Sequence, residues 1–369
     1  MSPRSLIERT FDVFARRLDG PLMVTLTVLA ALSLAVVFSA SGQSMDRTLG
    51  QARNFAFAIL VLWVAANVPP QQLMRLAIPI YMGGLALLIS VALFGEIRNG
   101  ARRWLSLGFA TIQPSEIMKI GVPLLLAWYF HRKEAGLDIK DYGIAGLMLL
   151  VPTFLILRQP DLGTAVLVFS SGFFVVFLAG LSWKLLITAG VAAVGALPFA
   201  WGMLHDYQRN RVLTLLDPST DPLGAGYHII QSTIAIGSGG ILGKGWLNGT
   251  QSQLDFIPER STDFILAVFG EEFGLLGLLL LLTLYLIVIG RGLMIAMNAP
   301  TTFSRLLAGA ITLTFFTYAF VNVGMVTGIL PVVGVPLPLV SYGGTAILSM
   351  FMGFGILMSI STHKRLVST

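Results

Sequence analysis

Apolar residues along this chain gather into ten stretches, separated by polar connections that are mostly short. A helix needs roughly 20 predominantly apolar residues to cross about 30 Å of hydrocarbon, and the stretches approach that length. The pattern therefore predicts an all-α integral membrane protein with about ten transmembrane helices. The predicted segments are 22–40, 54–68, 76–95, 114–131, 143–158, 164–181, 185–204, 264–289, 306–328 and 344–361.

The connections between these segments differ in length and composition. Arg158-Gln159-Pro160-Asp161 separates the fifth segment from the sixth, and its proline predicts a tight turn because proline lacks an N–H donor and disfavours helix in the residue before it. Residues 205–262, between the seventh and eighth segments, are long enough to cover a substrate as a lid. Three prolines between residues 331 and 338 precede Ser341-Tyr342-Gly343-Gly344. That part is not helical throughout and should be buried in protein or line a cavity.

The Lys and Arg residues predict the orientation in the membrane. With the N-terminus in the cytoplasm, the short connections on the cytoplasmic side contain more Lys and Arg than those on the other side. An even number of spans then places the C-terminus in the cytoplasm and residues 205–262 outside. Residues 1–20 combine an apolar stripe with arginines, which is typical of an amphipathic helix on an anionic membrane surface. Residues 1–369 are predicted to form one polytopic membrane domain.

Composition narrows the class of protein further. Hydrophobic residues make up 55% of the chain and charged residues 11%, whereas soluble proteins are about 25% charged. The absence of cysteine excludes disulfides, thiolate metal sites and a cysteine nucleophile. The net charge is +6, but the basic residues are scattered singly between apolar runs. They therefore indicate membrane topology and contact with lipid headgroups, and we predict no nucleic-acid partner.

Two ionisable residues lie near the start of the fourth predicted segment. Glu116 and Lys119 are three residues apart, so they are neighbours on one face of a helix. Charged groups inside a span cost several kcal/mol and are functional candidates for that reason. One interpretation is a neutralised pair near the membrane interface. The other is a charged wall of an aqueous cavity, which we favour because Lys119 is a full turn into the span.

A second polar cluster, Asp255 to Phe264, lies where the long connection meets the eighth segment. The ordinary interpretation of an Asp, Ser or Thr in front of an apolar run is a helix N-cap. However, Ser261 or Thr262 is also available as a cap. An acid at the outer rim of a span, facing a loop that can cover it, is well placed to accept a proton. We therefore predict Asp263 as the catalytic residue.

The long connection contains a glycine-rich stretch, Gly237 to Gly245. It is not a phosphate-binding loop of the nucleotide-binding type, because neither the first glycine nor the Ser or Thr of that motif is in place. A simpler function is still open, in which backbone N–H groups and Lys244 bind an anion. Glu271 and Glu272 follow in the eighth segment. At least one of them must face the bundle interior, where structural hydrogen bonding and chemistry are equally open.

The sequence favours a hard cation over zinc as a metal partner. The four histidines lie far apart, and none has a second ligand at helical spacing. Mg²⁺ or Mn²⁺ is a candidate cofactor, because a single carboxylate such as Asp263 can hold such an ion together with a substrate phosphate.

Six motifs in this order resemble those of a known family. They are Arg103-Trp104, Gln113-Pro114-Ser115-Glu116, Gln159-Pro160-Asp161-Leu162-Gly163-Thr164, the loop from Asp217 to Gly245, Pro258-Glu259-Arg260 with Thr262-Asp263-Phe264, and Pro338-Leu339-Val340-Ser341-Tyr342-Gly343-Gly344. The chain resembles the SEDS proteins (shape, elongation, division and sporulation) over nearly its whole length. Val333-Gly334-Val335-Pro336 is more similar to the rod-shape branch than to the division branch. Ser261 departs from the pattern, since many relatives have His there, and this leaves Asp263 as the candidate for proton transfer.

The resemblance implies a bacterial peptidoglycan glycosyltransferase of the inner membrane that polymerises lipid II during cell elongation and maintains rod shape. It implies an inverting transfer that forms a β-1,4 bond. The implied partners are a class B penicillin-binding protein and other membrane proteins of the elongation complex. The essential aspartate of the family corresponds to Asp263. Its other functional polar positions correspond to Arg47, Arg103, Glu116, Lys119 and Asp161, and we add Lys244, Glu259 and Arg260 as candidate substrate-binding residues.

A flippase or transporter of lipid-linked precursors is the alternative function. Ten spans, buried charges and broken helices fit it, but such a site is expected near the membrane midplane, whereas most charges here lie at the outer rim. We expect Lys119 to reach the Asp263 cavity with Glu116 beside it. Because a nearby cation lowers the pKa of a carboxyl, this network is predicted to hold Asp263 ionised.

Overall fold

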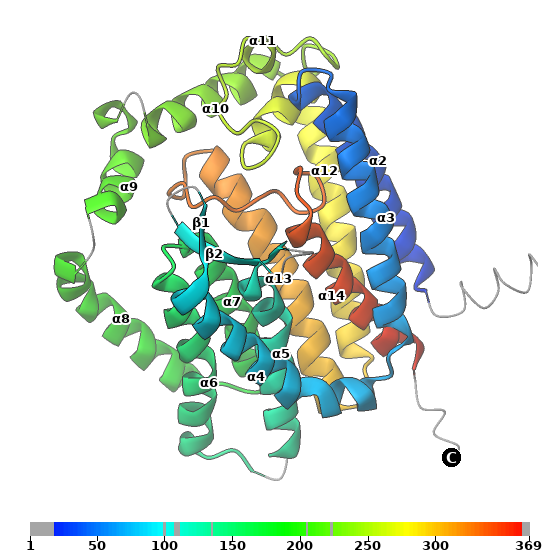
Figure 1. Ribbon diagram of the computed structural model, residues 1–369, viewed down its shortest axis with the longest axis vertical. Helices are drawn as coiled ribbons and strands as arrows, with labels where there is room; N and C mark the ends of the chain where they lie inside the picture. Colours follow the sequence, from blue (N-terminus) through cyan, green and yellow to red (C-terminus); the bar gives the residue numbers. More distant parts are fainter. Residues whose placement is uncertain are drawn as a thin grey trace, which may run out of the picture.

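The computed structural model describes residues 18–98, 101–106, 111–133, 136–203, 206–221 and 224–363, and within them the chain is mostly helical (Figure 1). Ten of the described helices each overlap one predicted segment. They are α2 (Gly20–Ala40), α3 (Met45–Asn67), α4 (Pro70–Phe94), α5 (Pro114–Arg132), α6 (Ile139–Leu157), α7 (Leu162–Leu178), α8 (Trp183–Met203), α12 (Ile265–Met297), α13 (Thr302–Val326) and α14 (Thr345–Thr362). The predicted amphipathic segment 1–20 lies almost wholly outside the described residues.

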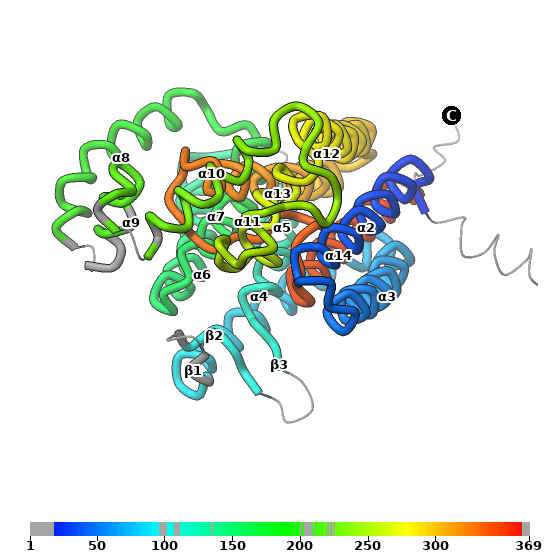
Figure 2. Tube along the Cα trace, turned by 90° about the horizontal axis from the view of Figure 1, so that it is seen from above, coloured from blue at the N-terminus to red at the C-terminus, as the bar shows by residue number. Residues whose placement is uncertain are grey.

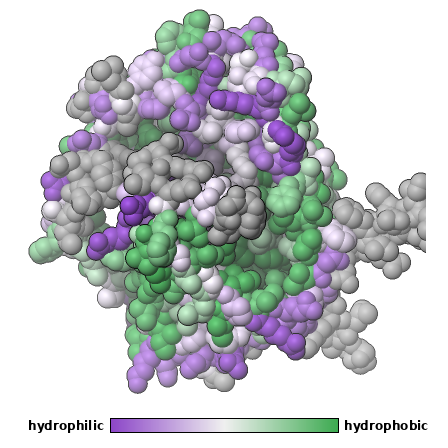
Figure 3. Space-filling view, viewed as in Figure 1, coloured by the Kyte–Doolittle hydropathy of each residue, from purple (hydrophilic) through white to green (hydrophobic). Residues whose placement is uncertain are grey.

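The length and apolar composition of the helices indicate that they span a membrane. In the described part of the chain, seven helices are long and apolar enough to cross a membrane, and α7 and α8 add two shorter apolar helices. On the face seen in Figure 3, an apolar band lies between polar surfaces at the top and bottom of the view. The prediction of a mostly helical, multi-span membrane protein is confirmed.

Two helices differ from the predicted segments in an informative way. Helix α3 begins at Met45 rather than at residue 54, since Ser44 caps it by accepting a hydrogen bond from the N–H of Arg47. Polar residues in its first turns hide this start from an apolar pattern. Helix α12 is interrupted at Gly274, where φ is 63° and ψ is −162°. A residue with a side chain rarely adopts that conformation, and glycine does so without steric cost.

A small sheet follows α4 and makes the all-α expectation incomplete. Strands β1 (Glu96–Arg98), β2 (Ala101–Ser106) and β3 (Thr111–Ile112) pair antiparallel in the order β1-β2-β3. Figure 2 shows them at one side of the bundle, beyond α4. The apolar pattern could not predict such short strands, because each has few residues and little of an alternating pattern. Their effect is to bring the second strand to the N-terminal ends of α5 and α7.

The long connection after α8 is largely helical. It contains α9 (Asp206–Leu216), a short 3₁₀ helix (Pro218–Thr220), α10 (Ala225–Gly239) and α11 (Thr250–Gln253). Helices α10 and α11 lie over the end of the bundle at the top of Figure 1. Ser232 of α10 donates a hydrogen bond to the carbonyl of Val326 at the end of α13 (2.8 Å). The connection is thus a helical cover packed on the bundle, and the adjoining proline-rich segment before α14 is non-helical, as predicted.

At the opposite end, a buried acid joins three helices. Asp19 caps α2 by accepting from the N–H of Leu22. Its two carboxylate oxygens accept hydrogen bonds from Arg291 of α12 at 2.9 and 2.7 Å, and one also accepts from Ser361 of α14 at 3.1 Å. Although burial opposes ionisation, Arg291 and the cap bonds hold the pKa of Asp19 below its usual range. This contact fixes the register of the helices that carry the site at their other ends.

Candidate active site

A polar cavity of about 260 Å³ lies near the N-terminal ends of α5, α7, α12 and α14. Its walls come from β2, the first turns of α5 and α7, the turn before α12, and the non-helical segment before α14. Five of the predicted site residues line it together: Arg103, Glu116, Lys119, Asp161 and Asp263. They come from four different parts of the chain, and only the tertiary fold brings them to one place.

Asp263 is the acid at the rim of this cavity, and it does not cap a helix. Helix α12 has Phe264 as its N-cap and no side-chain cap bond. The hydroxyl of Thr262 bonds instead to Glu259, at 2.9 Å from Oε2. The N-cap interpretation of Asp263 is therefore wrong. Its half-buried carboxyl is left to face the cavity.

The environment of Asp263 makes it a stronger base than an exposed aspartate. Burial raises the pKa of its carboxyl from 3.8 to about 6, and the negative charge of Glu259 adds to the effect. The expectation that Lys119 lowers this pKa is wrong, because the charge of Lys119 is neutralised by a closer acid. A carboxyl with a pKa near 6 is mostly ionised at neutral pH and still basic enough to accept a proton.

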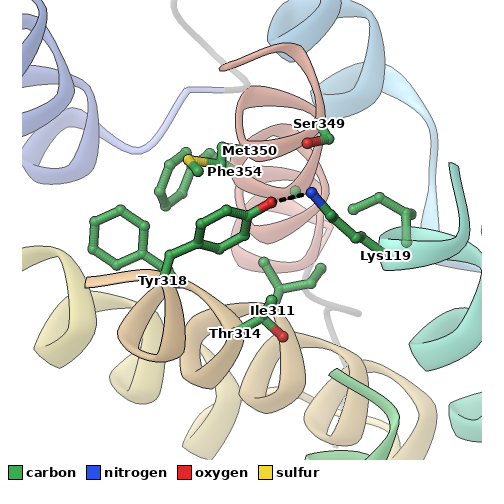
Figure 4. A pocket seen from close by; sticks show the side chains of 10 residues that line it. Lys119, Ile311, Thr314, Tyr318, Ser349, Met350 and Phe354 are labelled. Atoms are coloured by element: carbon green, nitrogen blue, oxygen red, sulfur yellow. Dashed lines mark hydrogen bonds between the residues drawn. The ribbon is translucent and has the colours of Figure 1, made fainter. Parts of the chain in front are cut away.

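Lys119 is held in a buried network rather than paired with Asp263. Its amine donates to Glu116 Oε1 at 2.7 Å, and also to the hydroxyl of Tyr318 from α13. The other oxygen of Glu116 accepts from the hydroxyl of Ser349 in α14 at 2.6 Å. Figure 4 shows the amine pointing at the Tyr318 hydroxyl, beside a chamber of about 40 Å³. The side chain of Lys119 is 6% exposed and lines both this chamber and the polar cavity.

Arg103 and Asp161 form the second pair in the cavity. Asp161 caps α7 by accepting from the N–H of Thr164 at 3.1 Å, and it also accepts from the side-chain amide of Gln113 at 3.3 Å. The Arg103 Nε lies 3.7 Å from Asp161 Oδ2. A second nitrogen of Arg103 donates to the carbonyl of Pro160 at 2.6 Å. These bonds join the sheet to the α6–α7 turn and present one guanidinium to the cavity.

Three other predicted residues lie around the turn before α12 and do not line the cavity. Arg47 donates to the Ser261 hydroxyl at 3.3 Å. Arg260 pairs with Asp255 at 2.6 Å and donates to a carbonyl of α11. Glu259 is exposed and acts on the cavity through its charge. These three residues support the turn that presents Asp263.

Lys244 is not brought to the cavity either. Its amine pairs with Glu271, a fully buried carboxylate of α12, at 2.7 Å. The same carboxylate accepts from the N–H of Gln251 at 2.9 Å and from the hydroxyl of Thr250 at 3.1 Å. The expectation that Lys244 and the glycine-rich loop bind an anionic ligand is not supported, because a protein carboxylate already occupies that place.

The glycine-rich loop replaces missing hydrogen bonds of α12. At the break, the carbonyls of Glu271 and Glu272 accept from the N–H groups of Lys244 and Gly245, each at 3.0 Å. Beyond the break, Leu275 and its neighbour donate to loop carbonyls at 2.9 and 3.1 Å. An uninterrupted helix would pair these four groups with one another. The covering connection is thus inserted into the helix that follows Asp263.

Three buried polar residues near the site were not predicted. Tyr318 and Ser349 hold the Lys119 network, and Asn322 of α13 donates to the carbonyl of Asp263 at 2.8 Å. None of the three is a charged side chain, so the cost of burying a charge does not indicate them. An amide within an apolar span is the signal that indicates Asn322, which is fully buried.

An apolar groove of about 450 Å³ adjoins the polar cavity. It lies between α3, α4, α5 and α14, and its lining is mainly apolar. Gln113, Glu116 and Thr345 belong to the walls of both spaces. The arrangement combines a base, two cationic groups and a neighbouring apolar surface, which suits a substrate that is anionic, hydroxylated and attached to a lipid.

The chain is similar to known proteins over nearly its whole length. The model of a family described as cell cycle proteins, covering FtsW, RodA and SpoVE, matches residues 21–366. Peptidoglycan glycosyltransferase MrdB of Escherichia coli strain K12 is 53% identical over 355 residues, which cover 95% of each chain. The probable peptidoglycan glycosyltransferase FtsW of Geobacter metallireducens is 34% identical over 363 residues, which cover 95% of this chain and 96% of its own.

Solved structures share the fold. A chain of a peptidoglycan synthase complex, described for its coordination of polymerization and crosslinking, is 34% identical with a TM-score of 0.81. The match covers 93% of this chain and 97% of that one. The crystal structure of the rod shape determining protein RodA from Thermus thermophilus is 28% identical with a TM-score of 0.70, covering 93% and 96%.

Proposed function

The chain belongs to the FtsW/RodA/SpoVE family, and we propose that it polymerises lipid II into glycan strands with Asp263 as the general base. It is a multi-pass membrane protein and a peptidoglycan glycosyltransferase of the rod-shape type. One observation carries the mechanistic proposal. A half-buried carboxyl with a pKa of about 6 faces a cavity that also contains Arg103 and Lys119.

The proposed reaction is a single in-line displacement. The 4-hydroxyl of the acceptor sugar attacks C1 of the donor sugar, which is α-linked to a lipid diphosphate. A new oxygen–carbon bond forms at C1 while the bond from C1 to the diphosphate oxygen breaks, so that the product linkage is β-1,4. The hydroxyl proton passes to the Asp263 carboxylate, and the lipid diphosphate leaves with the bonding electrons. General-base catalysis of this kind contributes typically about 10²–10⁴-fold.

The cationic groups of the cavity suit the departing diphosphate. Lys119 lines the cavity and has three N–H donors, of which Glu116 and Tyr318 accept two. Arg103 is only partly enclosed, with about a third of its side chain exposed (35%). Fixed donors near a developing negative charge stabilise the transition state more than water does. The apolar groove beside Glu116 supports a lipid-linked substrate, since an isoprenoid chain needs an apolar surface.

The cofactor proposal is limited to one cation. In the described part of the chain, no group of three or more His, Cys, Asp or Glu side chains could hold a metal ion by itself. Mg²⁺ or Mn²⁺ would therefore be shared between Asp263 and phosphate oxygens of the substrate, which hard cations accept. When bound, it would supply positive charge next to the leaving diphosphate.

We also propose where the enzyme works and with what. The outer position of the cavity fits the inner membrane of a bacterium with both termini cytoplasmic and lipid II presented on the outer face. A class B penicillin-binding protein is the proposed partner, together with other membrane proteins of the elongation complex. Support comes from the similarity to a chain of a peptidoglycan synthase complex.

The test is polymerisation of lipid II by the purified full-length protein with a class B penicillin-binding protein in detergent micelles. Asp263→Asn keeps the shape of the side chain and removes the base, so we expect at least about a hundredfold loss of rate, the lower end of the range for general-base catalysis. Asp46→Asn is the matched control, because Asp46 is an exposed acid at the start of α3. A parental rate for Asp263→Asn would end the base assignment. If the parental protein forms no polymer, the result favours a flippase, because a micelle has no second membrane side to which a flippase could move its substrate.

A further inference from the structure

The main chain that bears Asp263 is held from outside its own helix. Three successive carbonyl groups, those of residues 261–263, accept hydrogen bonds from the last part of the chain. The donors are the Tyr342 N–H at 2.9 Å, the Ser341 hydroxyl at 2.5 Å and the Asn322 side-chain amide at 2.8 Å. Of these donors, Asn322 is the one that contacts the Asp263 residue itself.

Asn322 uses both hydrogens of its amide on main-chain carbonyls. The second bond goes to the carbonyl of Val335, at 2.7 Å. The side chain is fully buried, and its oxygen Oδ1 has no hydrogen-bond partner within the described residues. Leaving a buried acceptor unpaired is energetically unfavourable. The position therefore uses Asn322 as a double donor, at the expense of its acceptor.

The two carbonyls that Asn322 joins belong to Asp263 itself and to Val335, whose neighbour Gly334 lies beside the Asp263 carboxylate. Gly334 lines the cavity, and a Cβ built on it would lie 3.4 Å from Asp263 Oδ2. Gly334 has φ of +71°, a left-handed conformation that glycine adopts without strain. One amide thus fixes both the main chain of the base and the segment that faces its carboxylate.

We propose that Asn322 is a positioning residue that sets the place of the Asp263 carboxylate relative to the cavity wall at Gly334 and Val335. The inference rests on the proposed function of Asp263. Asn322 is not one of the described residues that line the cavity. It therefore acts through Asp263 and not on the substrate. A displacement of about 1 Å at a reacting group can cost roughly a hundredfold in rate.

The experiment compares two substitutions of Asn322 with a control in the same helix. Asn322→Leu keeps the branched skeleton of the side chain and removes both donors, and Asn322→Ser keeps one. Thr312→Val is the control, because the buried Thr312 hydroxyl bonds, within the part of the chain that the structure describes, only to the carbonyl of Ala308 in α13 (2.8 Å). Each variant is purified with the partner, its monodisperse fraction is measured, and kcat and KM for lipid II are determined between pH 5 and 8.

We expect Asn322→Leu to lower kcat by about 10–100-fold while KM changes less than about threefold, because the base is displaced and substrate binding is not. Asn322→Ser should recover part of kcat. The acidic limb of the Asn322→Leu profile should move to lower pH, since a looser turn admits water to Asp263. Thr312→Val should stay within about twofold of the parent, as is usual for substitutions away from the reacting groups.

Three outcomes would overturn the inference. The first is a parental kcat in folded Asn322→Leu, and the second is failure of both Asn322 variants to fold, which would make the role structural. The third is an unchanged pH profile with kcat and KM altered together. These results differ from a failure of the proposed function, in which Asp263→Asn itself polymerises at the parental rate.

Discussion

The raised pKa of Asp263 can be tested by removing one of its two causes. Burial is the larger cause and the charge of Glu259 the second. Glu259 is exposed, and its Oε2 accepts a hydrogen bond from the Thr262 hydroxyl at 2.9 Å. Glu259→Gln removes the charge and keeps an oxygen acceptor at that place. The substitution should therefore lower the pKa of Asp263 without releasing the turn.

The expected size of the effect follows from the pKa. A base works in its ionised form, so activity is present above a pKa of about 6 and is lost as the pH falls through it. Asp263 is about nine-tenths ionised at pH 7, half at pH 6 and about one-tenth at pH 5, when its pKa is about 6. With the ordinary value of 3.8 it would still be more than about nine-tenths ionised at pH 5. The parental rate should thus fall about tenfold between pH 7 and pH 5.

The assay is the initial rate of lipid II polymerisation at saturating substrate from pH 4.5 to 8, with the protein returned to pH 7.5 afterwards to confirm full recovery. For Glu259→Gln we expect a midpoint of the acidic limb that is lower than the parental one but still above 3.8, because burial is unchanged. A parental profile that is flat down to pH 5 would refute the raised pKa. An identical midpoint in the variant would refute the contribution of Glu259.

Three further predictions concern the other charged groups. Lys119→Met should lower the polymerisation rate at least about a hundredfold, and equal activity of parent and variant would contradict this. It should also destabilise the protein, because breaking a buried pair costs about 3–5 kcal/mol. The double variant with Glu116→Gln should restore stability but not activity. Lys244→Met leaves Glu271 unpaired, so the thermal unfolding temperature should fall by several degrees while KM stays constant, and a raised KM in a stable variant would instead place Lys244 at the substrate. Chelation by EDTA should abolish polymerisation and Mg²⁺ or Mn²⁺ should restore it, whereas a rate unaffected by EDTA would exclude the cation.

The spans of this fold are predictable from apolar residues because lipid demands them. Any helix that crosses hydrocarbon must be apolar over about 20 residues. The same rule does not apply to parts of the chain that lie outside the hydrocarbon. The first turns of α3 contain Arg47 and Gln51, and strands β1 to β3 are outside the apolar pattern, so neither was predicted. Local hydrogen bonds form those parts instead, namely the Ser44 cap at the start of α3 and the pairing of the three strands.

The site was partly predictable because a charged residue inside a span is energetically costly and is therefore a functional candidate. That argument found Glu116 and Lys119, and the family resemblance added Arg103 and Asp161, which line the same cavity. It misplaced Lys244, because pairing with a carboxylate 27 residues later in sequence depends on how the connection folds back onto α12. Sequence spacing predicts neighbours along one helix, and it does not predict partners between helices.

The charges of the cavity also explain how Asp263 stays a base. Lys119 is neutralised by Glu116 and Arg103 lies beside Asp161, so neither cation is left to stabilise the Asp263 carboxylate. A carboxylate paired firmly with Lys119 would have a low pKa and little tendency to accept a proton. With Asp263 ionised, these five side chains carry one net negative charge. An anionic diphosphate entering that cavity needs additional positive charge, which is the physical reason to expect a divalent cation to arrive with the substrate.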